Sequence, residues 1–342
     1  MPSPAPRIAT QLVEPLVDWL ISQGAGVDGL LRSMGLTLHE VRSPSAMIPL
    51  AAYVELFEQA ARVSGDPHFG LHLGRFEEPG SVGALGYLFM SGASLLDAFE
   101  DFSAHLDALQ EDTANRVVID GDTITFQYRI NDIRIAHRRQ DSEYSIAAMH
   151  SLARAYSAAR IVPMRICFEH RHAGRYSHYH DWFQCDVHFG QPFNALIYRR
   201  EGFNVRSRRP SQLLNPIIAS HLDRLAARKS TPRSYHRRVS ELIDLHMVET
   251  DCSQARVAKA LGISVSTLIR KLRTEGHSFR KLLMERRLQY AEWLLTQDET
   301  PVASIALAVG YAENASFTRA FQRRHAQSPA QFRRSQRRIR TA

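Results

Sequence analysis

The chain has 342 residues, a formal net charge of +8, and 44% hydrophobic and 23% charged residues. This is the composition of ordinary globular protein, and the length suggests two domains. The three cysteines include no CxxC pair, which argues against a disulfide-rich or zinc-cluster protein. No apolar run approaches the roughly 20 residues of a membrane span, and the N-terminus is unlike a signal peptide. These features predict a cytoplasmic protein.

The positive charge is concentrated toward the C-terminus. Residues 229–342 contain 21 lysines and arginines against 10 aspartates and glutamates, whereas residues 1–228 contain 22 against 25. A basic segment that follows a slightly acidic one predicts a contact with a polyanion in the last third of the chain.

The first 130 residues mix helical and strand patterns. Apolar residues at helical spacing predict helices at 8–23, 27–34 and 50–63, and a longer one from a cap at Ser94 to about Glu111. Alternation around Asp120-Gly121-Asp122 predicts a hairpin of strands 115–119 and 123–130. The glycine-rich stretches 65–74 and 80–86 lack the Lys-Ser/Thr of a phosphate loop, so tight turns are their favoured use.

A charged segment follows, at the start of a helix that we expect to reach about Arg160. Arg139, Asp141 and Glu143 could touch a small effector, but an ion-pair and capping set at the helix start is the favoured use. Seven aromatic residues of this domain could line a pocket, but core positions are their favoured use: Phe57, Phe69, Phe89, Phe99, Phe126, Tyr144 and Phe168. Further along we expect strands at 164–169, 187–189 and 195–198, helices at 176–182 and 213–228, the edge of the domain at 206–209, and a polar linker at 229–234.

Three motifs of this region resemble those of a known domain. They are Gly65-Asp66-Pro67 with Gly70, Leu71 and Gly74; Gly83-Ala84-Leu85-Gly86-Tyr87; and Arg139-Gln140-Asp141 with Glu143-Tyr144. They are similar to the N-terminal effector-binding domain of AraC-family regulators, in members that respond to ornithine and related small metabolites. The resemblance covers about 8–205 and implies a small-molecule effector without naming it.

The C-terminal third contains a repeated helix-turn-helix pattern. Ala258, Leu261, Gly262 and Ile263 recur 48 residues later as Ala306, Val309, Gly310 and Tyr311, and Leu268, Arg270 and Leu272 recur 49 residues later as Phe317, Arg319 and Phe321. The alanine allows two helices to cross closely, the glycine permits the tight turn, and the large apolar residues pin the second helix to the core. Two such units on a basic background predict a DNA-binding domain rather than a plain helical bundle.

A single uninterrupted helix is predicted between the two units. No Pro or Gly falls between Ser278, which can cap the helix, and Gln297. Asp298-Glu299 should stop it, and Thr300 and Pro301 should serve as cap and first residue of the next helix.

Residues 237–336 resemble the DNA-binding domain of the AraC/XylS family of bacterial transcription regulators. The resemblance rests on motifs that include Ser266-Thr267-Leu268, Arg286-Arg287-Leu288, Val309-Gly310-Tyr311, Arg319-Ala320-Phe321 and Ser328-Pro329. Ala326 departs from the family, which often has Gly there. The resemblance implies an activator that binds promoter double-stranded DNA, works with RNA polymerase, and in some cases forms a homodimer.

The candidate DNA-binding residues lie on the second helix of each unit. In the first unit they are Ser264, Ser266, Thr267, Ile269, Arg270 and Lys271; in the second they are Asn314, Ala315, Ser316, Thr318, Arg319 and Arg323. Arg suits guanine and Asn suits adenine in the major groove. By similarity to the family, Ser266, Ile269 and Arg270 face bases. Ser264, Ser316, Arg323 and Arg324 are better candidates for phosphate contacts.

No catalytic or metal site is expected. Several of the 16 histidines gather at 170–188, but no His-Glu-x-x-His or zinc spacing accompanies them, and we expect no cofactor. Two alternatives remain open: an N-terminal enzyme fused to the DNA-binding domain, and a regulator without a ligand. The sequence predicts an α+β fold, with an effector domain at 8–205, a connecting helix and linker at 206–235, and an all-α DNA-binding domain at 236–336.

Overall fold

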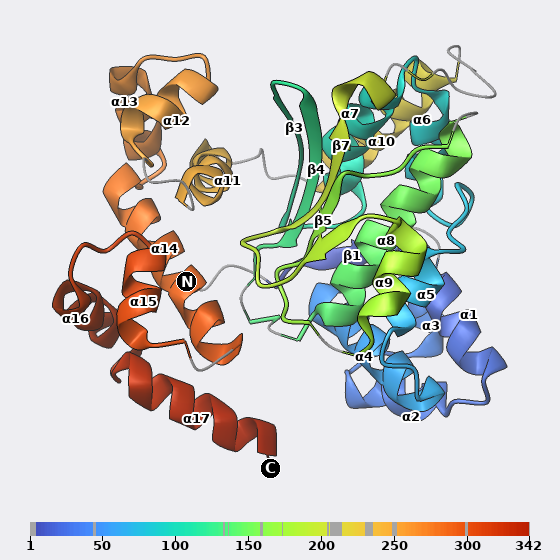
Figure 1. Ribbon diagram of the computed structural model, residues 1–342, viewed down its shortest axis with the longest axis horizontal. Helices are drawn as coiled ribbons and strands as arrows, with labels where there is room; N and C mark the ends of the chain where they lie inside the picture. The colour runs from blue at the N-terminus through green and yellow to red at the C-terminus, as the bar shows by residue number, and fades with distance from the viewer. Residues whose placement is uncertain are drawn as a thin grey trace. The chain divides into compact units, whose positions relative to one another are not determined.

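The computed structural model describes residues 5–43, 46–132, 134, 135, 137–157, 160–172, 174–203, 205, 214–229, 235–247, 252–297 and 300–341. The expected domain edge at 206–209, all but the first residue of the linker at 229–234, and the helix stop at 298–299 lie outside these residues. The chain forms two compact units, Met1–Lys229 and Ser230–Ala342. The expected mixed α+β class is confirmed (Figure 1).

Helices make up most of the regular secondary structure in the described part of the first unit. The α-helices are α1 (Glu14–Ser22), α2 (Val27–Ser33), α3 (Leu38–Val41), α4 (Leu50–Ser64), α5 (Phe69–Gly74), α6 (Ala84–Ser91), α7 (Leu95–His105), α8 (Arg139–Tyr156), α9 (Tyr176–Phe183) and α10 (Asn215–Lys229). Three short 3-10 helices accompany them: η1 (Thr10–Leu12), η2 (Leu106–Ala108) and η3 (Arg200–Phe203).

Two sheets complete the first unit. A small antiparallel sheet pairs β1 (Arg7–Ala9) with β2 (Met47–Pro49). The larger sheet has the order β3 (Thr113–Asp120), β4 (Thr123–Ile130), β7 (Asn194–Arg199), β5 (Arg165–Cys167), β6 (Asp186–His188), antiparallel except for the β5–β6 pair. Because side chains alternate along a strand, Phe126 and Tyr128 of β4 share one face, and both are buried.

Helix α8 is the centre of this unit. It packs against β4 and β7 on one side and against α4, α5 and α6 on others (Figure 1). Its apolar residues Ile146, Met149, Leu152 and Tyr156 are all buried. Residues at this helical spacing on an 18-residue helix form a continuous stripe, so α8 joins the sheet to the helical layer.

The glycines of 65–74 have a use that we did not expect. Gly65 does end α4 in the left-handed conformation, but Gly70 and Gly74 lie within α5, where α8 crosses. A Cβ atom on Gly70 would lie 2.0 Å from the Gln140 carbonyl oxygen, and one on Gly74 would lie 2.7 Å from the Tyr144 carbonyl oxygen. The prediction of tight turns was therefore wrong for these two residues, which allow two helices to approach closely.

Three expected helix boundaries also differ from the structure. The expected helix at 8–23 begins as strand β1, because Ile8 pairs with Ile48 across the small sheet. Ser94 caps α7 as predicted, through a capping box with Asp97, but the α-helix ends at His105. Helix α8 ends at Tyr156, not near Arg160. Pairing with a distant strand sets the first of these boundaries, and such pairing leaves no local pattern in the sequence.

All regular secondary structure in the described residues of the second unit is helical. Its helices are α11 (Tyr235–Met247), α12 (Gln254–Ala260), α13 (Val265–Thr274), α14 (Phe279–Gln297), α15 (Val302–Ala308), α16 (Asn314–His325) and α17 (Pro329–Thr341). None of the helices in the described ranges, in either unit, combines the length and apolar character that crossing a membrane requires.

Helix α14 contributes to both hydrophobic cores of this unit. Its first half places Phe279 and Leu282 in a core with α11, α12 and α13, and its second half places Leu288, Ala291 and Leu295 in a core with α15 and α16. The predicted uninterrupted helix is confirmed, and the Ser278 hydroxyl accepts a hydrogen bond from the Lys281 amide. The next helix begins differently from expectation: Pro301 is the N-cap residue of α15, and no side chain caps it.

Candidate nucleic-acid interface and effector cavity

The first helix pair consists of α12 and α13. Gly262 lies in the turn with φ +65°, and Ala258 and Leu268 are buried between the helices. Ser264 begins α13: its hydroxyl accepts a hydrogen bond from the Thr267 amide and lies 2.9 Å from both the Ser266 and Thr267 hydroxyls. The candidate phosphate-binding serine is thus also the helix cap, so its loss would affect both roles.

The second helix pair, α15 and α16, repeats this arrangement with one difference. Gly310 lies in the turn with φ +80°, and Ala306 and Phe317 are buried. The segment between α12 and α13 is 261–264, whereas the segment between α15 and α16 is 309–313. This one extra residue explains why the sequence repeat shifts from an offset of 48 before the turn to 49 after it.

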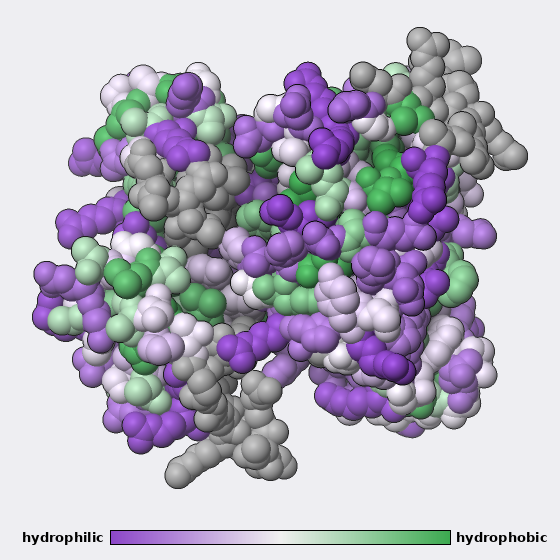
Figure 2. Space-filling view, in the orientation of Figure 1, coloured by the Kyte–Doolittle hydropathy of each residue, from purple (hydrophilic) through white to green (hydrophobic). Residues whose placement is uncertain are grey.

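The side chains proposed to face bases lie on the exposed sides of α13 and α16. Ser266, Ile269 and Arg270 are exposed on α13, with Ile269 48% exposed although it is apolar. Asn314, Ala315 and Arg319 are exposed on α16, whereas Ser316 and Thr318 are half-buried. Figure 2 shows hydrophilic side chains along the edge of this unit where α16 lies. The contacts of these residues with DNA stay a prediction.

Two basic candidates contact side chains of neighbouring helices. The Lys271 ammonium lies 4.9 Å from the centre of the Tyr235 ring, and Arg324 donates a hydrogen bond of 3.0 Å from Nε to Glu292. Both contacts turn a positive charge toward a neighbouring helix. Arg323, by contrast, is exposed at the last turn of α16, which suits a phosphate contact.

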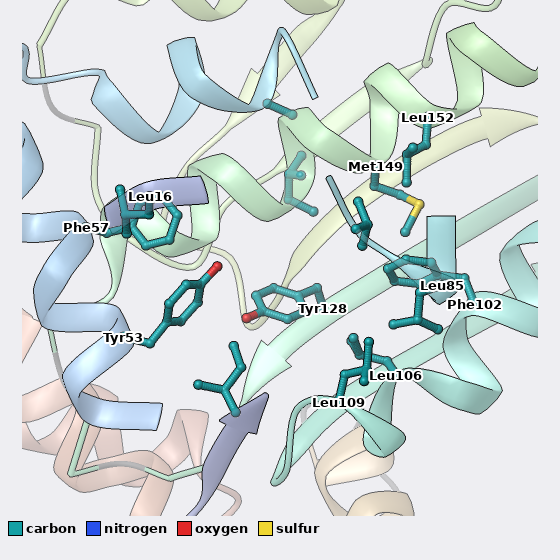
Figure 3. Close-up of a cluster of buried hydrophobic side chains, with 14 of the residues drawn as sticks. Leu16, Tyr53, Phe57, Leu85, Phe102, Leu106, Leu109, Tyr128, Met149 and Leu152 are labelled. Carbon is teal, nitrogen blue, oxygen red and sulfur yellow. The ribbon is translucent and has the colours of Figure 1, made fainter. Parts of the chain in front are cut away.

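The first unit contains a small cavity between α8 and the sheet. Its volume is about 60 Å³. Six helices and strands (η1, α4, α7, η2, β4 and α8) and two connecting segments contribute to its lining: Leu12, Tyr53, Val82, Phe102, Leu106, Gln110, Phe126, Tyr128, Tyr144, Ser145, Ala148, Met149 and Leu152. Figure 3 shows Tyr53 and Tyr128 with their hydroxyls turned toward one another among these apolar side chains. Phe126 and Tyr144, which we expected to be core, form part of the wall.

The motif Arg139–Tyr144 forms a buried polar network beside this cavity. Glu143 accepts hydrogen bonds from the Tyr179 hydroxyl (2.7 Å) and from Arg139 (3.2 Å), and Arg139 also donates to the Pro67 carbonyl. Asp141 accepts a hydrogen bond of 2.9 Å from Tyr128, so it lies behind the cavity wall. Arg139 and Glu143 do not line the cavity; contact of these three residues with an effector stays a prediction.

Burial controls the ionisation of this network. Desolvation raises the pKa of Asp141 to about 7, although hydrogen bonding from Tyr128 and the charge of Arg138 oppose it. Desolvation likewise raises the pKa of Glu143 to about 7, against the charge of Arg139 and the hydrogen bond from Tyr179. The start of α8 is capped from outside the motif, because the Gln140 amide donates to Glu58 of α4.

The histidines of 170–188 are distributed among core and surface contacts. His178 lies 3.1 Å from His72, whose other ring nitrogen lies 2.6 Å from Asp66. His170 is buried, and desolvation lowers its pKa to about 4. Within the described ranges, no three His, Cys, Asp or Glu side chains gather in a way that could hold a metal ion.

Helix α10 is anchored to the wall of the cavity. The Asn215 amide donates a hydrogen bond of 2.8 Å to Asp101 of α7, and His105 lies 3.5 Å from Asp223. Leu222 is fully buried in the first unit, and α10 packs against η2, which supplies the lining residue Leu106. The last described helix of the first unit is therefore in contact with an element that forms the cavity.

Two helix-turn-helix pairs on one shared helix, together with a separate α/β unit, define a DNA-binding transcription regulator with an effector-binding domain. Residues 24–206 match the family described as "Arabinose-binding domain of AraC transcription regulator, N-term", and residues 257–335 match the "Helix-turn-helix domain". The chain belongs to the AraC family of transcription regulators.

Curated relatives agree with this assignment. The chain is 25% identical over 298 residues to the HTH-type transcriptional regulator VirS of Mycobacterium tuberculosis, covering 84% of this chain and 85% of the relative. It is 24% identical over 337 residues to the Ornithine utilization regulator of Pseudomonas aeruginosa, covering 96% and 97%. Among solved structures, CdpR of Pseudomonas aeruginosa is 19% identical, with a TM-score of 0.43, and covers 93% of this chain and 98% of CdpR.

Proposed function

We propose that this chain is a cytoplasmic activator that binds promoter DNA through α13 and α16, contacts RNA polymerase, and responds to a small-molecule effector in the first unit. Activation is favoured by one relative, the Urease operon transcriptional activator of Escherichia coli, which is 43% identical over 77 residues, 22% of this chain and 26% of the relative. The name of the Ornithine utilization regulator favours a metabolite as effector. A homodimer would pair two such chains on one promoter.

The observation that carries the proposal is the continuity of α14. Its 19 residues at roughly 1.5 Å each span about 28 Å, and successive major-groove faces on one side of B-DNA lie about 34 Å apart. Because each half of α14 belongs to a different core, a single DNA-binding unit can present α13 and α16 to successive grooves. Arg270 and Arg319 occupy corresponding positions on the two helices, while Ile269 and Thr318 differ, so the two half-sites should differ in sequence.

Effector control would act through the contacts of α10. A ligand that enlarges the cavity must displace part of its wall, and Leu106 of η2 belongs to that wall. Movement of η2 would disturb the His105–Asp223 contact and the packing of α10, the last described helix before the second unit. Such control requires that the effector bind two states of the first unit with different affinity. We assign this unit a regulatory and not a catalytic role; turnover of a substrate by purified 1–229 would contradict that assignment.

Footprinting tests the DNA-binding geometry. Wild-type protein should protect two short major-groove segments about 10 base pairs apart, centre to centre, per DNA-binding unit. Inserting Gly-Gly after Gln289, inside α14, should separate the two contacts and cost about 1 kcal/mol or more per glycine in helix stability. The proposal fails if a folded insertion variant keeps both contacts with unchanged affinity. The same insertion after Gln336, outside both helix pairs, is the control.

The boundary between the units can be tested separately. We propose that residues 230–342 fold alone and bind DNA without effector, since the two units form separate sets of contacts. Electrophoretic mobility shift with this fragment at low salt is the measurement. A fragment that is folded by circular dichroism but does not bind would contradict an independent DNA-binding domain.

A further inference from the structure

The cavity beneath α8 has no charged side chain in its lining. The nearest carboxylates lie behind its wall: the Tyr128 hydroxyl donates to Asp141, and the Tyr144 hydroxyl donates to Glu77, each at 2.9 Å. An anionic ligand would find no cation here and would face two acidic groups. A cationic ligand would lose its hydration without reaching a carboxylate directly. The lining therefore disfavours either sign of charge.

The Tyr53 hydroxyl is available to a ligand in this cavity, whereas the Ser145 hydroxyl takes part in a hydrogen bond with Tyr128. Tyr128 donates to Asp141 and accepts a hydrogen bond of 3.0 Å from Gln110, so its hydroxyl is already engaged. In the part of the chain that the structure describes, no hydrogen bond joins the Tyr53 hydroxyl to another group, and Figure 3 shows it turned into the space between the aromatic rings. A hydroxyl that faces a mainly apolar cavity can form a hydrogen bond with a ligand, so a ligand that bonds to Tyr53 gains affinity from it.

The volume limits the size of the ligand. A water molecule needs roughly 10–15 Å³ of such space, so a cavity of about 60 Å³ accepts about four to six non-hydrogen atoms. Larger molecules must move the wall. Met149, whose unbranched thioether chain adapts easily to a new shape, is the lining residue best able to yield.

We propose that this cavity binds a small, uncharged and mainly apolar molecule that carries one hydroxyl or carbonyl group, with that group hydrogen-bonded to Tyr53. This inference rests on the proposed effector role of the first unit and names the chemical class of the effector. Charged amino acids, carboxylic acid anions and polyols are excluded by the same lining, because each would bury polar groups that the cavity cannot satisfy.

The Met149 methyl group provides a local signal for binding. Full-length protein with carbon-13-labelled methionine methyl groups would be titrated with n-butanol, butyrate, n-butylammonium and glycerol, with the Met149 resonance assigned through Met149→Leu. We expect n-butanol to shift this resonance saturably, butyrate and n-butylammonium to bind at least about tenfold more weakly, and glycerol to have no effect. The Met284 methyl, on α14 in the second unit, should not respond.

Two variants and one control assign the effect to the cavity. Tyr53→Phe should weaken n-butanol binding about fivefold through loss of one hydrogen bond, and Ala148→Leu should abolish it by filling the space. Tyr87→Phe, which removes an exposed hydroxyl outside this cavity, should leave it unchanged. The proposal is overturned if n-butanol fails to shift Met149 saturably, or if butyrate binds as tightly as n-butanol.

DNA affinity measured on the same samples separates this inference from the proposed function. Saturable n-butanol binding with the expected preferences supports the ligand class whether or not DNA affinity changes. Binding that leaves both DNA affinity and promoter activation unchanged argues against effector control through this cavity. Tight butyrate binding that alters DNA affinity would refute the ligand class and support effector control.

Discussion

The Nε2 atom of His325 lies 2.6 Å from the Oε1 atom of Glu292, and the same oxygen accepts a hydrogen bond of 3.0 Å from Arg324. Glu292 belongs to α14 and is only 6% exposed, whereas its two partners form the last turn of α16. A carboxylate of α14 thus binds the C-terminal end of α16, where positive side chains also interact favourably with the helix dipole.

Replacing Glu292 should therefore loosen α16. We expect Glu292→Ala to lower the free energy of unfolding of the 230–342 fragment by about 2 kcal/mol. This is below the usual cost of breaking a fully buried pair because the Arg324 side chain is one-third exposed. Urea titration gives the value, with Glu285→Ala on the same helix as control. Equal stability of the Glu292 variant and wild type would show that the cluster is energetically neutral.

The recognition residues make a separate prediction. Arg319→Ala should weaken specific DNA binding by about 1–3 kcal/mol and relax the preference at one base position. Arg323→Ala, at the proposed phosphate contact, should weaken binding to all sequences similarly and reduce the salt dependence. Selection from a randomised operator library measures both. An equal loss on every sequence for Arg319→Ala would make Arg319 a phosphate contact.

Ala326 stores backbone strain at the end of α16. It has φ +55°, in the left-handed region at the C-cap of the helix, where a Cβ atom is unfavourable. Ala326→Gly should stabilise the 230–342 fragment by about 1 kcal/mol, seen as a higher urea midpoint with an unchanged slope. Ala303→Gly, within α15, is the control and should destabilise it. A lower midpoint for Ala326→Gly would contradict the assigned conformation.

The buried carboxyl of Asp141 predicts a pH dependence of stability. Its pKa is raised from 3.8 to about 7, chiefly by desolvation. Because the folded pKa exceeds the unfolded one, the stability from its neutral form is fully present below about pH 4 and is lost as the pH rises through 7. Asp141→Asn keeps a neutral side chain at every pH. The free energy of unfolding of the first unit in Asp141→Asn, minus that in wild type, should therefore increase by about 2 kcal/mol from pH 5 to pH 8.

Urea titrations at the two pH values, with Asp122→Asn in the exposed hairpin turn as control, give the comparison. If the difference between Asp141→Asn and wild type stayed constant with pH, Asp141 would not titrate in this range, and burial would not govern its ionisation.

The DNA-binding unit could be predicted closely because its signals are local. Serine caps, glycines in the turns and uninterrupted apolar spacing determine where α13 and α14 begin, and these features recur at α16 apart from its cap, which is Glu313. The contacts of Glu292 with Arg324 and His325 could not be predicted, because they join residues about 32 positions apart on two different helices. Arg324 consequently differs from Arg323, although the two are neighbours in sequence.

The cavity of the first unit could not be predicted from local patterns for a similar reason. Its wall combines Leu12, Tyr53, Tyr128 and Met149, which the fold brings together from four separate elements. The pairing of Ile8 with Ile48 is equally non-local, and the local apolar spacing at Ile8 predicts a helix instead. Glycines 70 and 74, four residues apart on α5, did carry a signal in retrospect: small residues at this spacing permit a close helix crossing, here with α8.

The division of α14 between two cores has a consequence for motion in the second unit. Leu282 and Leu288 are buried in different clusters, while Met284, between them, is 38% exposed. Amides near 284–286 are thus protected mainly by the helix itself, so their hydrogens should exchange faster than those on either side. Each helix pair could then unfold locally while the other stays folded. The stiffness of the turn of α14 at 284–286 would determine how much variation in half-site spacing the regulator tolerates on its promoters.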